Sequence, residues 1–132
     1  MAESKLKCVV VTPETTVLET DAEFVAFPAL DGELGVLPGR MPLVARLGHG
    51  LLRYKLGGAE KSLFVSGGFA QVQSNVVTLL VPTALERDKI VPAEVRKKLE
   101  AAQAETPVTP DGRADLARRI GSLRAQLRLA AG

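Results

Sequence analysis

The residue pattern of this chain changes once, near residue 84, and that change limits the folds available to it. Nine of the twelve glycines precede residue 70, and the first 84 residues divide into short apolar runs. After Pro82 the apolar side chains recur at helical spacing instead. Many short strands with no long helix between them are typical of an antiparallel sandwich or barrel. We therefore expect a β domain over residues 1–84 and a helical segment over residues 85–132.

Strand character is strongest where apolar runs are separated by turn residues. Phe69–Gln73 shows alternation of apolar and polar residues, and Gly57-Gly58, Gly67-Gly68 and Ser74-Asn75 predict tight turns between runs. Pro28, Asp31-Gly32 and Pro38-Gly39 are loop signals in the same way. The expected strands are Lys5–Thr12, Val17–Phe27 (with Val17, Phe24 and Phe27 as burial candidates), Leu43–Leu47, Gly50–Leu56, Lys61–Ser66, Phe69–Gln73 and Val76–Val81.

Two amphipathic helices are expected in the second part of the chain. Pro92 suits the first turn of a helix, where a missing N–H costs nothing, and Val95, Leu99 and Ala102 then recur at helical spacing. A loop is predicted over Thr106–Gly112, with Thr109 or Asp111 as the cap of a second helix. The apolar stripe of that helix is Leu116, Ile120, Leu123 and Leu127. The predicted fold class is thus α+β: an antiparallel β-sandwich of about ten short strands, followed by an antiparallel two-helix hairpin.

Residues that usually carry catalysis are scarce. Cys8 is the only cysteine, which excludes a disulfide framework and a multi-cysteine zinc site, and its apolar neighbours predict a buried, inert thiol. His49 is the only histidine, so a two-histidine metal site is excluded. A triad through His49 would need Ser66 or another serine nearby, and no G-x-S-x-G elbow occurs. Asp21 and Glu23 are expected as acidic neighbours on the solvent face of one strand. We predict no catalytic residue, no metal site and no phosphate-binding loop.

Charge is distributed unevenly along the chain. Residues 1–84 carry seven Lys or Arg against eight Asp or Glu, whereas residues 85–132 carry ten against seven. Such an asymmetry suggests two partners. The start, Met1–Lys5, lacks the apolar region of a secretory signal, and no run approaches the roughly 18 apolar residues of a membrane span. We expect an intracellular protein that reaches a membrane only through a partner.

Two segments carry a family resemblance. Residues 31–43 read DGELGVLPGRMPL, and residues 65–72 read VSGGFAQV, followed by VVTLL and TA. Both resemble the signatures of the epsilon subunits of bacterial F-type ATP synthases, G-E-L-G-x-x-P-G-x-x-P-L and S-G-G-x-x-x-V, then V-T-x-L and T-A. Their order and separation match, as does a two-helix C-terminus of this length. The mitochondrial delta subunit shares the fold of this family.

The resemblance implies a non-catalytic rotor subunit. Its sandwich would clamp the gamma subunit to the ring of membrane c subunits and couple proton-driven rotation to ATP synthesis in the catalytic head. The chain would lie peripherally, on the cytoplasmic face of the bacterial inner membrane. The loop containing Gly32, Gly35 and Gly39 would present a stiff tip to the c-ring. The expected ring contacts are Glu33, Arg40, which stands where many relatives carry histidine, and Met41.

The resemblance also implies that the helical hairpin is regulatory. In the family, its extended form packs along gamma and inhibits ATP hydrolysis. The candidate contacts with the catalytic alpha and beta subunits are Arg113, Arg118, Arg119, Arg124 and Arg128, for which a merely solvated basic face is the alternative. Some relatives bind ATP through I/L-D-x-x-R-A. Here Ile90 is followed by Val91 in place of Asp, and Glu94 replaces Arg, so we predict no useful ATP binding and no other cofactor.

Two other classes of protein stay open on the residues alone. One is a β-sandwich adaptor or nucleic-acid-binding module that uses the basic second helix. Against nucleic acid, the chain has only one Tyr and four Phe for base stacking. The other is an enzymatic or small-molecule-binding sandwich, which needs a pocket with convergent polar groups that no cluster in the sequence suggests. The partners that the family resemblance implies are gamma, the c-ring and the alpha and beta subunits.

Overall fold

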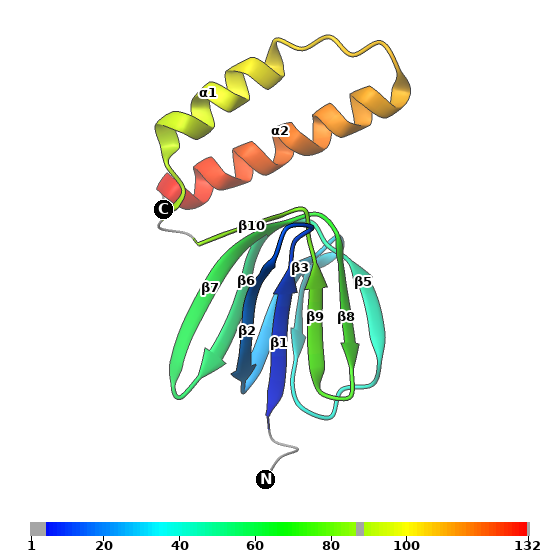
Figure 1. The fold of residues 1–132 in the computed structure, drawn as a ribbon, viewed down its shortest axis with the longest axis vertical. Coiled ribbons are helices and arrows are strands. Elements are labelled where there is room, and N and C mark those ends of the chain that lie inside the picture. The colour runs from blue at the N-terminus through cyan, green and yellow to red at the C-terminus, as the bar shows by residue number, and fades with distance from the viewer. Residues whose placement is uncertain (1–4, 87–88, 132) are drawn as a thin grey trace. The chain divides into compact units, whose positions relative to one another are not determined.

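The computed structural model describes residues 5–86 and 89–131, which form ten strands followed by two helices (Figure 1). They divide into two compact units, Met1–Leu85 and Glu86–Gly132. Met1–Ser4, on which the expectation about a secretory signal rests, lie outside the described residues. Neither described helix combines the length and the apolar character needed to cross a membrane.

Ten strands form two five-stranded sheets. The first sheet has the order β2-β1-β9-β8-β5, and the second has the order β10-β7-β6-β3-β4. β1 and β9 pair in parallel, and the other described pairs are antiparallel, which confirms the predicted fold class. The strands are β1 Leu6–Val11, β2 Thr16–Ala22, β3 Phe24–Ala29, β4 Gly32–Val36, β5 Leu43–Arg46, β6 His49–Leu56, β7 Ala59–Ser66, β8 Phe69–Gln73, β9 Val76–Leu80 and β10 Thr83–Glu86.

Alternate residues of each strand build the core between the sheets. In β1, for example, Leu6, Cys8 and Val10 are buried, whereas the side chains between them face outward. Phe27 from β3 is among the largest fully buried side chains. Each fully buried aliphatic or aromatic side chain contributes about 1.5–3 kcal/mol to folding. Burial also raises the pKa of the Cys8 thiol to about 12, in agreement with an inert cysteine.

The predicted strand Val17–Phe27 is wrong, because the structure has two strands there. β2 ends at Ala22 and β3 begins at Phe24. Glu23 lies at the corner, where its Oε1 accepts a 2.7 Å hydrogen bond from the Gly57 N–H. Asp21 and Glu23 therefore do not share a strand face. Val17 lies on the outer side of β2 and is 37% exposed, contrary to its prediction as a core residue.

The segment predicted as a loop after Phe27 is largely a hairpin. Pro28 lies within β3, and Gly32–Val36 form the edge strand β4, in which Pro28 pairs with Glu33. β3 pairs with β6 only over Phe24–Ala26, so the missing N–H of Pro28 removes no ladder bond on that side. Gly35 does not adopt a positive φ, whereas Gly32 does, at 125°. The loop proper is residues 37–42.

The two helices agree with prediction except at the second N-terminus. α1 spans Pro92–Gln103, with a proline in its first turn, and α2 spans Pro110–Ala131. The Gly112 N–H donates a 3.0 Å hydrogen bond to Thr109 Oγ1, which makes Thr109 the cap in preference to Asp111. The predicted loop over 106–112 is therefore too long, because its last three residues form the first turn of α2.

Candidate functional site

The loop of residues 37–42 passes from β4 in the second sheet to β5 in the first. Its first four residues form a turn in which the Arg40 N–H donates a 3.3 Å hydrogen bond to the Leu37 carbonyl. Pro38 and Gly39 occupy the middle positions, and Gly39 has a φ of 88°, as a type II turn requires. The Gly39 N–H also donates a 2.8 Å hydrogen bond to Asn75 Oδ1 in the β8–β9 turn. The loop is thus held by one hydrogen bond within its own turn and by a second one to the β8–β9 turn.

This loop presents apolar and cationic side chains to its surroundings. Met41 is 80% exposed and Leu37 is 62% exposed, and Arg40 between them is exposed as well. Together with Phe24 and Gly35, these side chains line an open depression of about 630 Å³. Exposed apolar side chains on a turn with fixed φ angles suit a contact with another macromolecule. The structure therefore brings the predicted residues Arg40 and Met41 together.

Glu33 does not belong to this loop. It is the second residue of β4, about 10 Å along the strand from Val36, where the strand ends. Its Oε2 accepts a 3.0 Å hydrogen bond from Arg53 Nε, and Arg53 Nη1 donates a 2.8 Å bond to Glu60. The hydrogen bond from Arg53 holds the pKa of Glu33 below its ordinary value. The structure thus places Glu33 in an ion-pair row on the outer side of the second sheet.

Sequence reasoning missed a second exposed surface, on the outer side of the first sheet. Phe69 of β8 is 49% exposed and lies opposite Leu80 of β9 and Arg46 of β5. The Arg46 guanidinium lies 6.0 Å from the centre of the Phe69 ring. The available signal was that Phe69 alternates in step with Gln71 and Gln73, which places an aromatic ring on the polar side of its strand. We name this surface the apolar outer face; its apolar members are Val9, Val11, Val17, Val44, Phe69, Val76 and Leu80.

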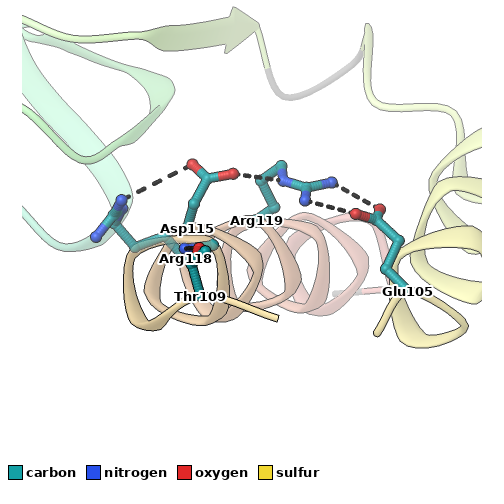
Figure 2. A network of polar contacts seen from close by, with 6 residues as sticks. Glu105, Thr109, Asp115, Arg118 and Arg119 are labelled. Carbon is teal, nitrogen blue, oxygen red and sulfur yellow. Dashed lines mark hydrogen bonds and ion pairs between the residues drawn. The ribbon is translucent and has the colours of Figure 1, made fainter. Parts of the chain in front are cut away.

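In the helical unit, one arginine joins the two helices (Figure 2). Arg119 of α2 donates two 2.9 Å hydrogen bonds to the carboxylate of Glu105, which follows α1. Its Nε donates a 3.1 Å bond to Asp115, one turn earlier in α2. The hydrogen bonds to Glu105 and Asp115 raise the pKa of Arg119, and Arg119 lowers the pKa of Glu105. This network closes the end of the hairpin.

The five predicted head-contact arginines fall into two groups. Arg119 is engaged as described, and Arg118 lies 3.8 Å from the same Asp115. The side chains of Arg113, Arg124 and Arg128 are exposed and have no ion pair within residues 5–86 and 89–131. Within the described part of the chain, the second group can meet a partner without breaking an ion pair.

His49 and Ser66 meet across β6 and β7. They are paired residues of the two strands, and His49 Nδ1 lies 2.6 Å from Ser66 Oγ. Ser66 ends a strand that leads into the β7–β8 turn, whereas a nucleophile elbow places serine on a strand-to-helix turn. Across the described part of the chain, no three His, Cys, Asp or Glu residues are grouped so as to hold a metal ion. We interpret the pair as a cross-strand hydrogen bond.

The two packed sheets and the two helices define a small β-sandwich protein with a helical hairpin. Residues 5–87 match the family described as ATP synthase, Delta/Epsilon chain, beta-sandwich domain. The chain belongs to this family, which confirms the resemblance carried by the two sequence motifs. It is therefore a subunit of an enzyme complex and is not itself the catalytic subunit. Neither a nucleic-acid-binding module nor an enzyme is favoured.

Individual relatives agree with the family match. The chain is 45% identical over 106 residues to the ATP synthase epsilon chain of Rhodopirellula baltica, covering 80% of this chain and 83% of that one. It is 38% identical over 128 residues to the epsilon chain of a Janthinobacterium species, covering 91% of each. In fold it is similar to a chain in the mitochondrial ATP synthase of Euglena gracilis, with a TM-score of 0.77, 23% identity and coverage of 98% and 82%.

Proposed function

We propose that this chain is a central-stalk subunit of an F-type ATP synthase that turns with the rotor. It couples proton-driven rotation of the c-ring to ATP synthesis at sites on other subunits. The observation that carries the proposal is the delta/epsilon family match over residues 5–87, supported by 45% identity to an ATP synthase epsilon chain. The chain would lie on the cytoplasmic face of the bacterial inner membrane, held there by the complex.

The gamma subunit is assigned to the apolar outer face of the first sheet. Phe69, Leu80 and Val44 are 49%, 54% and 70% exposed on neighbouring strands, so together they form one apolar surface. Removing such a surface from water contributes about 25 cal/mol for each Å² buried, which offsets the cost of association. A stalk that transmits torque needs a stable contact of this kind. Residues 1–84 would thus be the rotor-binding domain.

The c-ring is assigned to the loop of residues 37–42. Arg40 and Met41 project from a turn with a fixed shape, which suits contact with the polar loops of a membrane ring. Glu33 would contribute from β4, through a carboxylate whose two oxygens both accept hydrogen bonds from Arg53.

The helical hairpin, residues 85–132, is assigned a regulatory role. In an extended state its apolar stripes would pack along gamma, and its arginines would face the acidic surface of the alpha and beta subunits. Arg113, Arg124 and Arg128 are the side chains ready for that contact, because no ion pair within the described residues engages them.

The first test is complex formation with the gamma subunit of the same organism, measured by size-exclusion chromatography. We expect a stable one-to-one complex at micromolar concentrations. A Phe69→Ser, Leu80→Ser double variant should lose it, because the variant removes the two central apolar side chains. Val108→Ser is the matched control, since Val108 is 88% exposed in the loop between the helices. If the wild-type chain forms no complex, the stalk role is wrong; if the double variant binds normally, gamma uses another face.

A further inference from the structure

One hydrogen bond connects the loop of residues 37–42 with a turn 36 positions later in the chain. The Gly39 N–H donates to Asn75 Oδ1 at 2.8 Å. Gly39 is the third residue of a type II turn, whose own hydrogen bond uses the Arg40 N–H and leaves the Gly39 N–H free. Asn75 therefore supplies the acceptor that the turn itself lacks.

Asn75 is well fixed for this task. Ser74 and Asn75 have φ values of 51° and 62°, which is the two-residue hairpin turn that Asn tolerates better than most residues. Its backbone carbonyl accepts a 2.8 Å hydrogen bond from the Lys7 N–H of β1. Because three strands of the first sheet meet at this turn, the Asn75 backbone is held by contacts that do not involve the loop.

The loop has little else to hold it in place. Leu37 and Met41 are 62% and 80% exposed, and both line an open depression of about 630 Å³. A loop whose large apolar side chains are exposed depends mainly on its turn geometry and on its few polar contacts. Among the described residues, the bond to Asn75 is the one hydrogen bond between a side chain and residues 37–42. It connects the loop, which passes from the second sheet to the first, with a turn of the first sheet.

We propose that Asn75 is a positioning residue for the partner-binding loop: its side chain holds the turn at Gly39 so that Arg40 and Met41 are presented to the c-ring in one geometry. Asn75 itself does not touch the ring. The inference rests on the proposed function, in which this loop meets the ring. It predicts that removing the side-chain acceptor weakens ring binding although the contacting residues are unchanged.

Two substitutions separate the acceptor from the turn. Asn75→Gly keeps a residue that adopts a positive φ at no steric cost but removes the acceptor. Asn75→Asp keeps an oxygen in the same place, and Asp also tolerates this backbone conformation. In the isolated chain, we expect amide exchange at Gly39 to be about fivefold faster in Asn75→Gly and close to wild type in Asn75→Asp. Equal protection of Gly39 in Asn75→Gly would overturn the proposal.

The second measurement tests the consequence for the partner. Each variant is bound to gamma, and the affinity of that complex for purified c-ring is measured. We expect Asn75→Gly to bind the ring severalfold more weakly, Asn75→Asp to bind it normally, and the affinity for gamma to be the same in all.

A loop-tip variant, Arg40→Ser with Met41→Ser, is the reference for losing the contact itself. If the tip variant loses ring affinity and Asn75→Gly does not, the positioning role is overturned and the ring contact stands. If the tip variant binds the ring normally, the loop does not contact the ring, and both the positioning role and that part of the proposed function are overturned.

Discussion

At the scale of single residues, Gly68 is the position where the fold most strictly requires glycine. It has a φ of 84°, and a Cβ built there would lie 2.0 Å from the Leu80 carbonyl oxygen. Gly58 has nearly the same φ, 80°, but nothing lies within 4 Å of its Cβ position. The two glycines therefore have nearly the same backbone conformation, but only Gly68 has a neighbouring backbone atom where a Cβ would lie.

This difference gives a matched pair of substitutions. We expect Gly58→Ala to lower the free energy of unfolding by about 1 kcal/mol, the cost of a left-handed conformation for a residue with a Cβ. Gly68→Ala should cost at least about 3 kcal/mol, because the clashing atom belongs to the backbone of β9 and the strand would have to move. Urea denaturation of the full chain measures both. If the two variants have similar urea midpoints, the contact with the Leu80 carbonyl oxygen is not the reason why position 68 requires glycine.

Sequence reasoning found the turn at Gly67-Gly68 but had no means of finding this contact. The distance from Gly68 to Leu80 follows from the pairing of β8 with β9, which is long-range information. The same limit explains Glu33. Its glycine and proline neighbours favoured a loop, whereas the structure makes Glu33 part of an edge strand. Its ion-pair partner, Arg53, lies twenty residues later in the chain. Local composition identified the motif correctly and its conformation wrongly.

At the scale of elements, the hairpin is held at its loop end by the Glu105–Arg119 ion pair. Because Arg119 lowers the pKa of Glu105, the folded hairpin binds a proton at this site less readily than the unfolded chain does. Its stabilisation is fully present above the ordinary Glu pKa of 4.5 and is lost as the pH falls through the lowered value in the folded hairpin. The hairpin end should therefore loosen on acidification.

We expect amide exchange in residues 104–113 of the full chain, corrected for its intrinsic pH dependence, to lose protection as the pH falls below 4.5. Glu105→Gln should show low protection at every pH, because the charge is already absent. Glu100→Gln is the control: Glu100 lies in α1 and has no ion pair within the described part of the chain, so this variant should behave as wild type. A pH dependence that survives in Glu105→Gln would assign the effect to another group.

Element boundaries were predictable where one local signal dominated. Pro92 begins α1 as predicted, and Thr109 caps α2, as one of the two caps that the sequence allowed. The sequence did not distinguish Thr109 from Asp111 as the cap, because the neighbouring Pro110 and Gly112 are residues that favour a loop. It also joined β2 to β3, since the bonds that hold Glu23 at the corner, from its N–H to the Lys55 carbonyl and from the Gly57 N–H to its carboxylate, are with a distant hairpin.

At the scale of the whole molecule, the division into two regimes was visible because the apolar period changes from that of strands to that of helices. The structure has compact units over Met1–Leu85 and Glu86–Gly132. The order of the strands within the sheets was not visible. β1 pairs in parallel with β9, nearly seventy positions later, and no local pattern encodes that pairing. The apolar outer face, which depends on this order, was missed for the same reason.

The two units also differ in what their removal should do to an assembled enzyme. If the sandwich binds the rotor and the hairpin regulates, deleting residues 86–132 should leave assembly and proton coupling intact and raise ATP hydrolysis. Both activities can be measured in reconstituted membranes that carry the truncated chain. Loss of coupling would place rotor contacts in the hairpin, and unchanged hydrolysis would remove inhibition from its role.

Charge substitutions then decide how the hairpin would inhibit. Replacing Arg113, Arg124 and Arg128 with Ala leaves the Glu105–Arg119 clamp in place, so the closed hairpin is kept while the contacts of the extended form are lost. We expect ATP hydrolysis to rise towards that of the truncated chain, on the order of tenfold if inhibition is a two-state equilibrium. Arg119→Ala should have the opposite sign, because losing the clamp favours the extended form more than losing one contact disfavours it. Equal rises in both variants would mean that Arg119 serves the catalytic-head contact, and that opening the hairpin does not depend on its pair with Glu105.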